Sequence, residues 1–256
     1  QHNHFNDIIT YIRFKEKNMA EWLNSTFAGL DGGMFSAMNS LAKSAGTVMT
    51  PIFKVISLLG EKGILLILAS IVLMCFPNTR RAGVCLLGAI ACGALITNLI
   101  LKNSVMRLRP FEESEVFKGY WEFIGKPAED DYSFPSGHTT AFCAFATAMF
   151  LSFNKKWSYV GFFGVVLMGL SRIYLIAHYT TDVLAGIVVG GISGVAAYFI
   201  AKGIFDLLKK HSDNRFCKFC LNADIVNLFC KAEPLQKNQP QESSTEEKKA
   251  DAAKDE

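Results

Sequence analysis

Charged residues are scarce in this chain of 256 residues: only 19% are Asp, Glu, Lys or Arg, while 50% are hydrophobic. That balance is too apolar for a typical soluble domain and points towards a membrane. The formal net charge of +3 is too small to indicate a nucleic-acid partner. The polar start Q-H-N-H-F-N-D lacks a basic region followed by an apolar core, so no cleavable signal peptide is expected.

Cysteine is present but gives little sign of a metal site. Four of the seven cysteines fall in apolar stretches and are expected to be small buried hydrophobes: Cys75, Cys85, Cys92 and Cys143. The tail carries C-K-F-C at Cys217 and Cys220, which with Cys230 and His211 could supply four metal ligands. A single CxxC with irregular partners is weak evidence for zinc, so palmitoylation or reduced thiols are favoured and no metal or cofactor is expected.

Long hydrophobic runs are abundant. Five contain no charged residue: 63–76, 82–101, 139–153, 157–171 and 183–201. A bilayer span needs roughly 20 residues, which two runs reach alone and three reach with polar flanks. A sixth candidate, 34–59, contains Lys43 and Lys54, and a span is favoured there over a surface amphipathic helix. The pattern predicts an all-α integral membrane bundle of about six transmembrane helices.

Basic residues fall in alternate connections between these runs, which should therefore be cytoplasmic. The cytoplasmic groups are Arg80 and Arg81, Lys155 and Lys156, and Lys202, Lys209 and Lys210. Segment 102–136 and the surroundings of His178 then face outward, with both termini inside. The predicted organisation is a polar or amphipathic segment at 1–33, a membrane domain at 34–210 and a cytoplasmic tail at 211–256, disordered after about 233.

Three polar clusters interrupt the apolar chain on the predicted outer face. The first is K-N-S-V-M-R-L-R-P, in which Lys102 and Arg109 are seven apart and would share one face of a helix. Pro110 would then end the helix or turn the chain. Cations often snorkel at the end of a span. The positive-inside bias, however, disfavours three of them on the outer side.

The second cluster is P-S-G-H, comprising Pro135, Ser136, Gly137 and His138 at the mouth of an apolar run. It suits a helix cap, but equally an anion site that holds a proton donor.

The third cluster is S-R-I-Y-L-I-A-H-Y-T-T-D, from Ser171 to Asp182. His178 and Asp182 are four apart, which on a helix stacks them on one face. A carboxylate beside an imidazole fixes its tautomer and raises its basicity, although such a pair alone is usually a surface contact.

The three clusters together indicate a functional site more strongly than any one of them, because each charge near membrane depth costs about 2.5–3.5 kcal/mol on insertion scales. Lys102, Arg109 and Arg172 make a site for a multiply charged anion, and phosphate suits arginine forks. His138 and His178 suggest an acid and a nucleophile. No cluster of carboxylates lies among these motifs, so bound Mg²⁺ is not required.

The blocks K-x6-R-P, P-S-G-H and S-R-x5-H-x3-D, in this order, resemble the signature of the type 2 phosphatidic acid phosphatase superfamily. The likeness spans roughly residues 34–210 and is greatest to small bacterial membrane members that dephosphorylate lipid phosphates and undecaprenyl pyrophosphate. Arg107, which gives K-x4-R-x-R-P, is also usual in those members. The resemblance implies a phosphatidic acid phosphatase/haloperoxidase-type catalytic core within six membrane helices.

The resemblance also implies roles for single residues. His178 would attack phosphorus and become phosphohistidine, with Asp182 orienting it. His138 would protonate the leaving group and then activate water. The implied ligands of the phosphate oxygens are Lys102, Arg109, Arg172, the Ser136 hydroxyl and the Gly137 backbone N–H.

The expected activity is metal-independent hydrolysis of a lipid phosphate monoester or pyrophosphate at the outer face of a bacterial plasma membrane. Candidate substrates are phosphatidic acid, phosphatidylglycerol phosphate and undecaprenyl pyrophosphate; the sequence does not distinguish them, nor the oligomeric state. A lipid-linked phosphotransferase is the alternative, and a phospholipid or anion transporter is disfavoured because it needs no such histidines. Aromatic residues of loop 111–134 either face the lipid interface or pack within the loop.

Overall fold

The computed structural model describes residues 19–153 and 155–222. The predicted disordered tail after residue 233, Cys230 and most of the polar N-terminal segment lie outside the described residues. All regular elements within the described ranges are helices, which confirms the all-α prediction.

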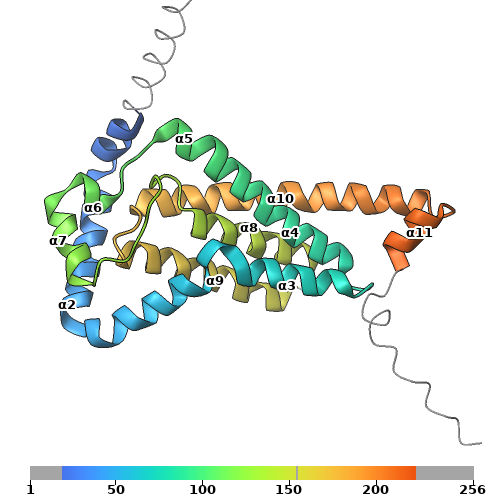
Figure 1. Ribbon diagram of the computed structural model, residues 1–256, viewed down its shortest axis with the longest axis horizontal. Coiled ribbons are helices and arrows are strands. Elements are labelled where there is room, and N and C mark those ends of the chain that lie inside the picture. The colour runs from blue at the N-terminus through green and yellow to red at the C-terminus, as the bar shows by residue number, and fades with distance from the viewer. Residues whose placement is uncertain (1–18, 154, 223–256) are drawn as a thin grey trace, which may run out of the picture. The chain divides into compact units, whose positions relative to one another are not determined.

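Each apolar run forms a helix, because its side chains are almost all uncharged and the backbone must satisfy its own hydrogen bonds. The helices that carry these runs are α2 (Ala28–Leu59), α3 (Ile64–Cys75), α4 (Arg80–Ala94) with the π-helical η2 (Leu95–Leu101), α8 (Gly137–Ser152), α9 (Lys155–Tyr174) and α10 (Thr180–Lys210). Helix α10 packs against α8 and α4, and α8 also contacts α9, so α8 lies at the centre of the bundle (Figure 1).

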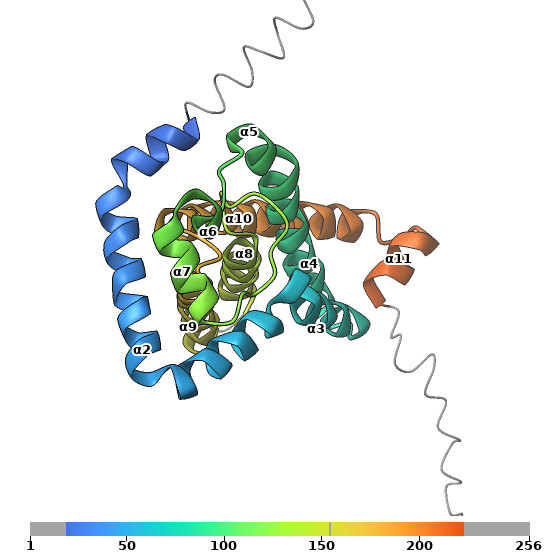
Figure 2. The same cartoon turned by 60° about the vertical axis from the view of Figure 1, so that its left-hand side comes forward.

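Helix α2 is bent and runs along the outside of α9 (Figure 2). Pro51 lies inside it, where it removes a backbone donor, and Ala45 has non-helical torsion angles of φ −133° and ψ 17°. Because α2 begins at Ala28, it crosses the predicted boundary between residues 33 and 34. Its inner face carries buried side chains, including Asp31 and Phe35.

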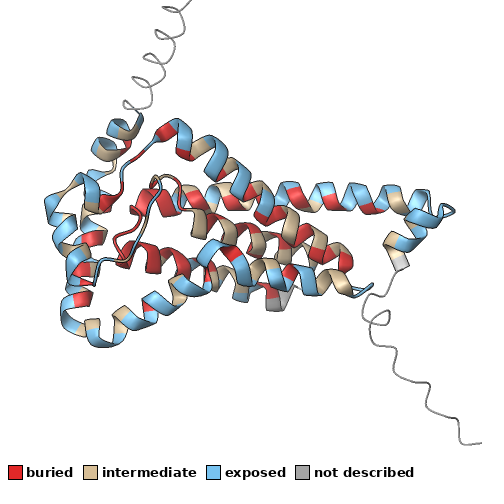
Figure 3. Ribbon diagram, viewed as in Figure 1, coloured by how far each residue is buried: buried red, intermediate tan, exposed pale blue. Residues whose placement is uncertain are grey.

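Three helical stretches among the described residues are long and apolar enough to cross a membrane: Ala28–Cys75, Arg80–Glu113 and Thr180–Lys210. Ser158–Tyr174 is apolar but shorter. Exposed residues dominate the outer helices while buried ones gather on α8 and around the loops at its start (Figure 3). The number of six spans stays a prediction.

Glycines bring α8 and α10 into close contact. A Cβ at Gly190 would lie 2.6 Å from the backbone oxygen of Thr140 and 2.9 Å from the backbone nitrogen of Ala144. Gly186 and Gly194 meet α8 in the same way. Small residues at this spacing let helices in a bilayer approach backbone to backbone. The starts of α8 and α10 are consequently held together.

The long connection between α5 (Lys102–Val105) and α8 contains two short helices, α6 (Pro110–Glu113) and α7 (Glu115–Phe123). Its aromatic side chains pack inward: the Phe117 ring lies 4.7 Å from that of Phe35, and Phe111 stacks on Trp121 with centroids 4.5 Å apart. Of the two alternatives for the loop aromatics, packing within the protein describes the three loop rings named here.

Candidate active site

Lys102 and Arg109 line the same cavity, but the backbone between them does not form the single helix that the sequence predicted. Helix α5 ends at Val105, because Met106 takes the left-handed conformation with φ 50°. Arg109 is extended and precedes α6, of which Pro110 is the first residue. The prediction that Lys102 and Arg109 share a helix face is therefore wrong, as is a helix ending at Pro110.

His178 lies in the turn between α9 and α10 rather than on a helix. The backbone N–H groups of Ala177 and His178 donate to the Arg172 carbonyl at 3.1 and 3.3 Å, which ties the turn to the end of α9. Ile176 has φ 53°, a strained conformation for a β-branched residue. Since α10 begins at Thr180, the prediction that His178 and Asp182 share one helix face is also wrong.

The three motifs nevertheless converge. A cavity of about 200 Å³ is lined by Lys102, Arg109, Gly137, His138 and His178. Arg172 lines an adjoining cavity that also reaches His138. The predicted cations and histidines therefore lie close together around these two cavities.

Ser136 occupies the N-cap position of α8, as expected, but its side chain makes no bond to the helix backbone. Its hydroxyl lies 3.0 Å from the Thr139 hydroxyl. Its backbone N–H donates to the Asp182 carbonyl at 3.0 Å, so this bond joins the P-S-G-H segment directly to α10. The P-S-G-H turn therefore fixes His138 at the start of α8 relative to the turn that carries His178.

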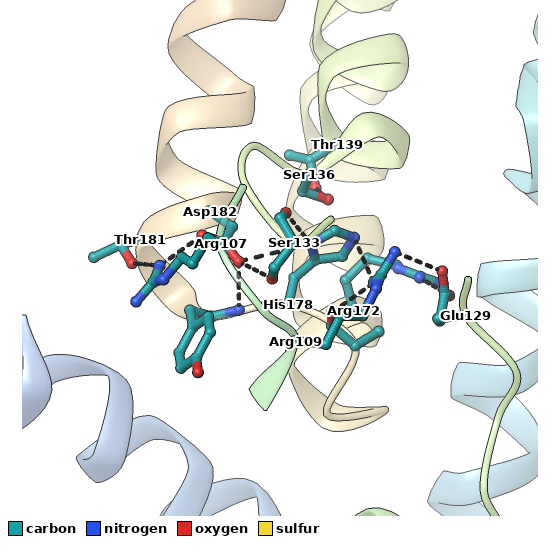
Figure 4. Close-up of polar contacts among 12 residues, drawn as sticks. Arg107, Arg109, Glu129, Ser133, Ser136, Thr139, Arg172, His178, Thr181 and Asp182 are labelled. Atoms are coloured by element: carbon teal, nitrogen blue, oxygen red, sulfur yellow. Dashed lines mark hydrogen bonds and ion pairs between the residues drawn. The ribbon is translucent and has the colours of Figure 1, made fainter. Parts of the chain in front are cut away.

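Two carboxylates of the loop before α8 are paired with the predicted phosphate ligands, and Figure 4 shows one of them, Glu129, beside Arg172 and Arg109. Asp131 contacts both Lys102 and Arg109. Glu129 contacts Arg172 and lies 3.0 Å from Arg109. Neither residue was predicted to belong to the site; the acidic run A-E-D-D at 128–131 was the signal available.

The charges around the cavity shift the ionisation of its groups. Burial raises the pKa of Asp131, but hydrogen bonds and charges from Lys102 and Arg109 outweigh it, so the pKa lies below the usual range. Burial, followed by the charges of Arg109, Arg172 and Lys102, holds the pKa of His178 well below its usual value. The His178 ring is therefore neutral at physiological pH.

Hydrogen bonding assigns the tautomer of this neutral ring. His178 Nδ1 lies 2.7 Å from the backbone oxygen of Ser133, which can only accept a hydrogen bond, so Nδ1 carries the proton. Nε2 is then unprotonated and lies 3.3 Å from Arg109 Nη1. The contact that fixes the tautomer is made by Ser133 and not, as predicted from the sequence, by Asp182, whose Oδ2 is 3.7 Å from Nδ1.

Asp182 is fully buried behind His178. It accepts hydrogen bonds from Arg107 Nη1 at 2.6 Å, from the Tyr179 backbone N–H at 2.9 Å and from the Ser133 hydroxyl. Arg107 was noted in the sequence only as an additional arginine. Its position at the carboxylate, like that of Ser133, was not predicted.

The possible metal ligands of the tail are not assembled in the part of the chain that the structure describes. There, no group of three or more His, Cys, Asp or Glu side chains is arranged to hold a metal ion. His211, Cys217 and Cys220 lie within that part, and Cys230 lies outside it.

Residues 82–205, which contain all three motifs, match the PAP2 superfamily. The chain is 33% identical over 126 residues to phosphatidylglycerophosphatase B of Bacillus subtilis, covering 45% of this chain and 54% of that protein. It is 30% identical over 119 residues to an undecaprenyl-diphosphatase of Sulfolobus acidocaldarius, covering 46% and 54%. A lipid A 1-phosphatase of Rhizobium etli is 36% identical over 112 residues, covering 43% and 46%. The chain spans about half the length of these curated relatives.

Two solved structures share the fold. The crystal structure of Aquifex aeolicus LpxE matches with a TM-score of 0.51 and 23% identity, covering 66% of this chain and 94% of that one. That of a transmembrane PAP2 type phosphatidylglycerolphosphate phosphatase from Bacillus subtilis matches with a TM-score of 0.50 and 21% identity, covering 81% and 98%. With its long apolar helices, the chain is an integral membrane protein.

Proposed function

Because this chain carries a PAP2 superfamily domain over residues 82–205, we propose that it is a lipid phosphatase that works through a phosphohistidine intermediate. The observation that carries the proposal is a neutral histidine, His178, with its unprotonated Nε2 beside three buried cations. Lys102, Arg109 and Arg172 are each no more than 7% exposed. Fixed cations with little access to water form a strong site for an anion.

The internal carboxylates support phosphate as that anion. Glu129 and Asp131 place oxygen atoms against all three cations, where phosphate oxygens would bind. The buried Nε of Arg172 has no hydrogen-bond partner among the described residues, so one donor is available for a ligand. An incoming phosphate group displaces the two carboxylates and takes over their contacts.

In the first chemical step, His178 Nε2 attacks phosphorus. A P–N bond forms while the bond between phosphorus and the leaving oxygen breaks. Burial and the charges of Arg172 and Lys102 lower the pKa of His138 to about 3. The bound phosphate offsets those charges, so His138 takes up its proton with the substrate and gives it to that oxygen across the same cavity. The developing charge on the equatorial oxygens is stabilised by the cations, the Gly137 backbone N–H and the Ser136 hydroxyl.

In the second step, His138 accepts a proton from water, and the resulting hydroxide attacks phosphorus. The P–N bond breaks, phosphate leaves and His178 is neutral again. Both steps use only side chains and backbone groups of this chain. The charge neutralisation that a metal supplies in other phosphatases comes here from lysine and arginine, so we propose a metal-independent route.

We assign the substrate to the phosphorylated lipids, either phosphate monoesters or diphosphates. An adjoining cavity of about 940 Å³ shares Glu129 and His138 with the reaction site and is also lined by Phe111, Trp121 and Leu175. Lys54, Glu61 and Lys126 also line this cavity, so its lining is mixed, and its apolar part suits the portion of a lipid next to the phosphate. The alternation of basic connections in the sequence supports our proposal that this site faces the outside of the plasma membrane and that the tail is cytoplasmic.

Trapping of the intermediate tests the proposal. Wild-type protein in detergent is mixed with a ³²P-labelled aryl phosphate and quenched in alkali, which preserves phosphohistidine. His178→Ala should show neither label nor turnover. His138→Ala should still accept label, because an aryl leaving group needs little protonation, but should release it slowly. His211→Ala, at the far end of α10, is the matched control and should behave as wild type.

Labelled His178→Ala, or an unlabelled wild type that still releases phosphate, would exclude the phosphohistidine route. A panel of phosphatidic acid, phosphatidylglycerol phosphate and undecaprenyl pyrophosphate, compared by kcat/KM, then identifies the substrate. Addition of lipid and sugar acceptors to the same assay separates hydrolysis from phosphotransfer.

A further inference from the structure

Arg107 lies between two buried carboxylates. Its Nη1 donates to Asp182 at 2.6 Å, and its Nη2 lies 3.0 Å from Asp31 Oδ2. Its Nε donates to the Asn24 side chain at 2.8 Å, and its guanidinium lies 3.6 Å from the centroid of the Tyr179 ring. The side chain has no exposed surface, so every one of these contacts is shielded from water.

Asp31 belongs to α2, outside the residues that match the PAP2 superfamily. Besides Arg107, it accepts hydrogen bonds from the Thr181 backbone N–H at 3.0 Å and from the Thr181 hydroxyl. The Thr181 hydroxyl in turn accepts a bond from Arg107 Nη1 at 2.7 Å. Helix α2 therefore reaches the first turn of α10, beside Asp182, the residue that faces His178.

Arg107 is not placed to bind substrate. It does not line the cavity that holds Lys102 and Arg109, and each of its three nitrogens already donates to a side chain. It lies on the far side of Asp182 from His178. An arginine fork suits this position because it can hold two carboxylates at once in a fixed geometry.

Two carboxylates and one guanidinium leave a single negative charge in a dry site. An isolated buried carboxylate would be costly, and removal of its partner usually changes its ionisation or position. Phosphorylation makes the His178 ring cationic, and the nearest carboxylate oxygen is Asp182 Oδ2, at 3.7 Å from Nδ1. Arg107 pairs with both Asp31 and Asp182, so its pairing with Asp31 determines how much of the negative charge of Asp182 it neutralises. The remaining charge is what stabilises the cationic ring.

We propose that Arg107 and Asp31 are positioning residues of the phosphatase reaction, which fix Asp182 behind His178 and so make helix α2 part of the catalytic apparatus. The inference rests on the proposed function, since it concerns the same histidine. It assigns to helix α2 a task in the chemical step, in addition to its packing along the bundle.

Steady-state kinetics of Asp31→Asn, Arg107→Gln and the double variant test this inference. Asp31→Asn keeps the shape and the acceptor for Thr181 but removes the charge, and we expect kcat to fall about tenfold. Arg107→Gln should lose more, about a hundredfold, and Arg107→Lys should recover part of that loss. KM and the inhibition constant of vanadate should stay within twofold, because the phosphate-binding cations are untouched.

The double variant should be no worse than Arg107→Gln, because Asp31 acts through Arg107. Asp206→Asn, the same change at the far end of α10, is the control and should leave all constants unchanged. Thr181→Val provides a near-isosteric second probe of the network if Asp31→Asn does not fold, with an expected severalfold loss of kcat.

Wild-type kcat in Asp31→Asn, or in Thr181→Val where that probe replaces it, would overturn the inference. So would a rise of KM and of the vanadate constant in step with the loss of kcat, which would indicate a loosened structure rather than a positioned histidine. An inactive wild type on every lipid phosphate would instead count against the proposed function itself, so the two failures are distinguishable.

Discussion

The imidazole Nδ1 of His178 lies 2.7 Å from the backbone oxygen of Ser133 but 3.7 Å from the Asp182 carboxylate. A backbone carbonyl has no proton to give, so this contact sets the ring tautomer whatever the state of Asp182. The tasks of orienting the nucleophile and of stabilising its positive charge are consequently divided between two groups.

This division predicts the effect of Asp182→Asn. In serine proteases, where the carboxylate itself sets the tautomer, the corresponding change costs about 10⁴ in kcat. Here the tautomer survives, so we expect only the loss of charge stabilisation, about 10² in kcat. Ser133→Ala, which removes the hydroxyl contact to Asp182 but keeps the carbonyl, should cost only a few-fold.

Both variants are measured by single-turnover phosphoenzyme formation, which isolates the attack step. A loss in Asp182→Asn as large as that in His178→Ala would show that Asp182, and not the Ser133 carbonyl, controls the tautomer.

The lowered pKa of His178 predicts the acid limb of the pH profile. The nucleophile must be neutral, and an ordinary imidazole becomes protonated below about pH 6.5. Burial and the charge of Arg109 hold the pKa of His178 below that range. Protonation of His178 should therefore lower kcat/KM only at a more acid pH. Arg109→Gln removes a cation, so the pKa should rise and the acid limb should move to higher pH.

Profiles of kcat/KM against pH, corrected for ionisation of the substrate phosphate, measure this shift. Lys118→Gln, which alters a surface cation paired with Glu115, should leave the limb in place. A wild-type acid limb near pH 6.5 that does not shift in Arg109→Gln would contradict a lowered pKa of His178.

The contacts of Glu129 and Asp131 with the cations predict that these carboxylates compete with substrate. Glu129→Gln should lower KM and the inhibition constant of inorganic phosphate about threefold or more, since Arg109 and Arg172 would be freed from an internal anion. Asp131→Asn should act in the same direction but less, because the Asp131 side chain is 51% exposed and its pairs are screened by water.

Glu115→Gln, which alters a surface carboxylate paired with Lys118, is the matched control for both and should leave the two constants unchanged. Weaker binding of phosphate in Glu129→Gln would mean that the carboxylate mainly holds the arginines in place, in which case it assists binding rather than competing with it.

The sequence predicted the helical runs and the meeting of the motif residues because both follow from composition and order along the chain. It misplaced Lys102 relative to Arg109 because the helix ends at Val105, just before the left-handed Met106, a residue with no intrinsic tendency to break a helix. No Gly or Pro marks that position, and the π-helical turn of η2 before Lys102 also has no local signature.

The partners of the site were harder to predict for a different reason. Asp31 bonds to Thr181 across 150 residues of sequence, and no periodicity relates an isolated carboxylate on one helix to a turn on another. Glu129 lies in a connection without regular structure. Both contacts arise from tertiary packing, and the sequence signals were the acidic run at 128–131 and the cost of leaving such charges near apolar surroundings.

The contact between α8 and α10 gives a stability prediction with a control next to it in the sequence. Gly190→Ala would place a Cβ 2.6 Å from the Thr140 backbone oxygen, whereas a Cβ at Gly191 meets nothing within 4 Å. Alanine favours a helix over glycine by about 1 kcal/mol, so Gly191→Ala should be neutral or stabilising. Gly190→Ala should cost about 1–3 kcal/mol, because the helices must separate.

Because α8 carries His138 and α10 carries Asp182, separation of the two helices also moves the halves of the site apart. Gly190→Ala should therefore lower both the Tm in detergent and kcat, while Gly191→Ala keeps wild-type activity. Thermal unfolding and turnover of the two variants measure these effects side by side. Equal behaviour of the pair would mean that the close approach of α8 and α10 at Gly190 does not hold His138 and Asp182 in register.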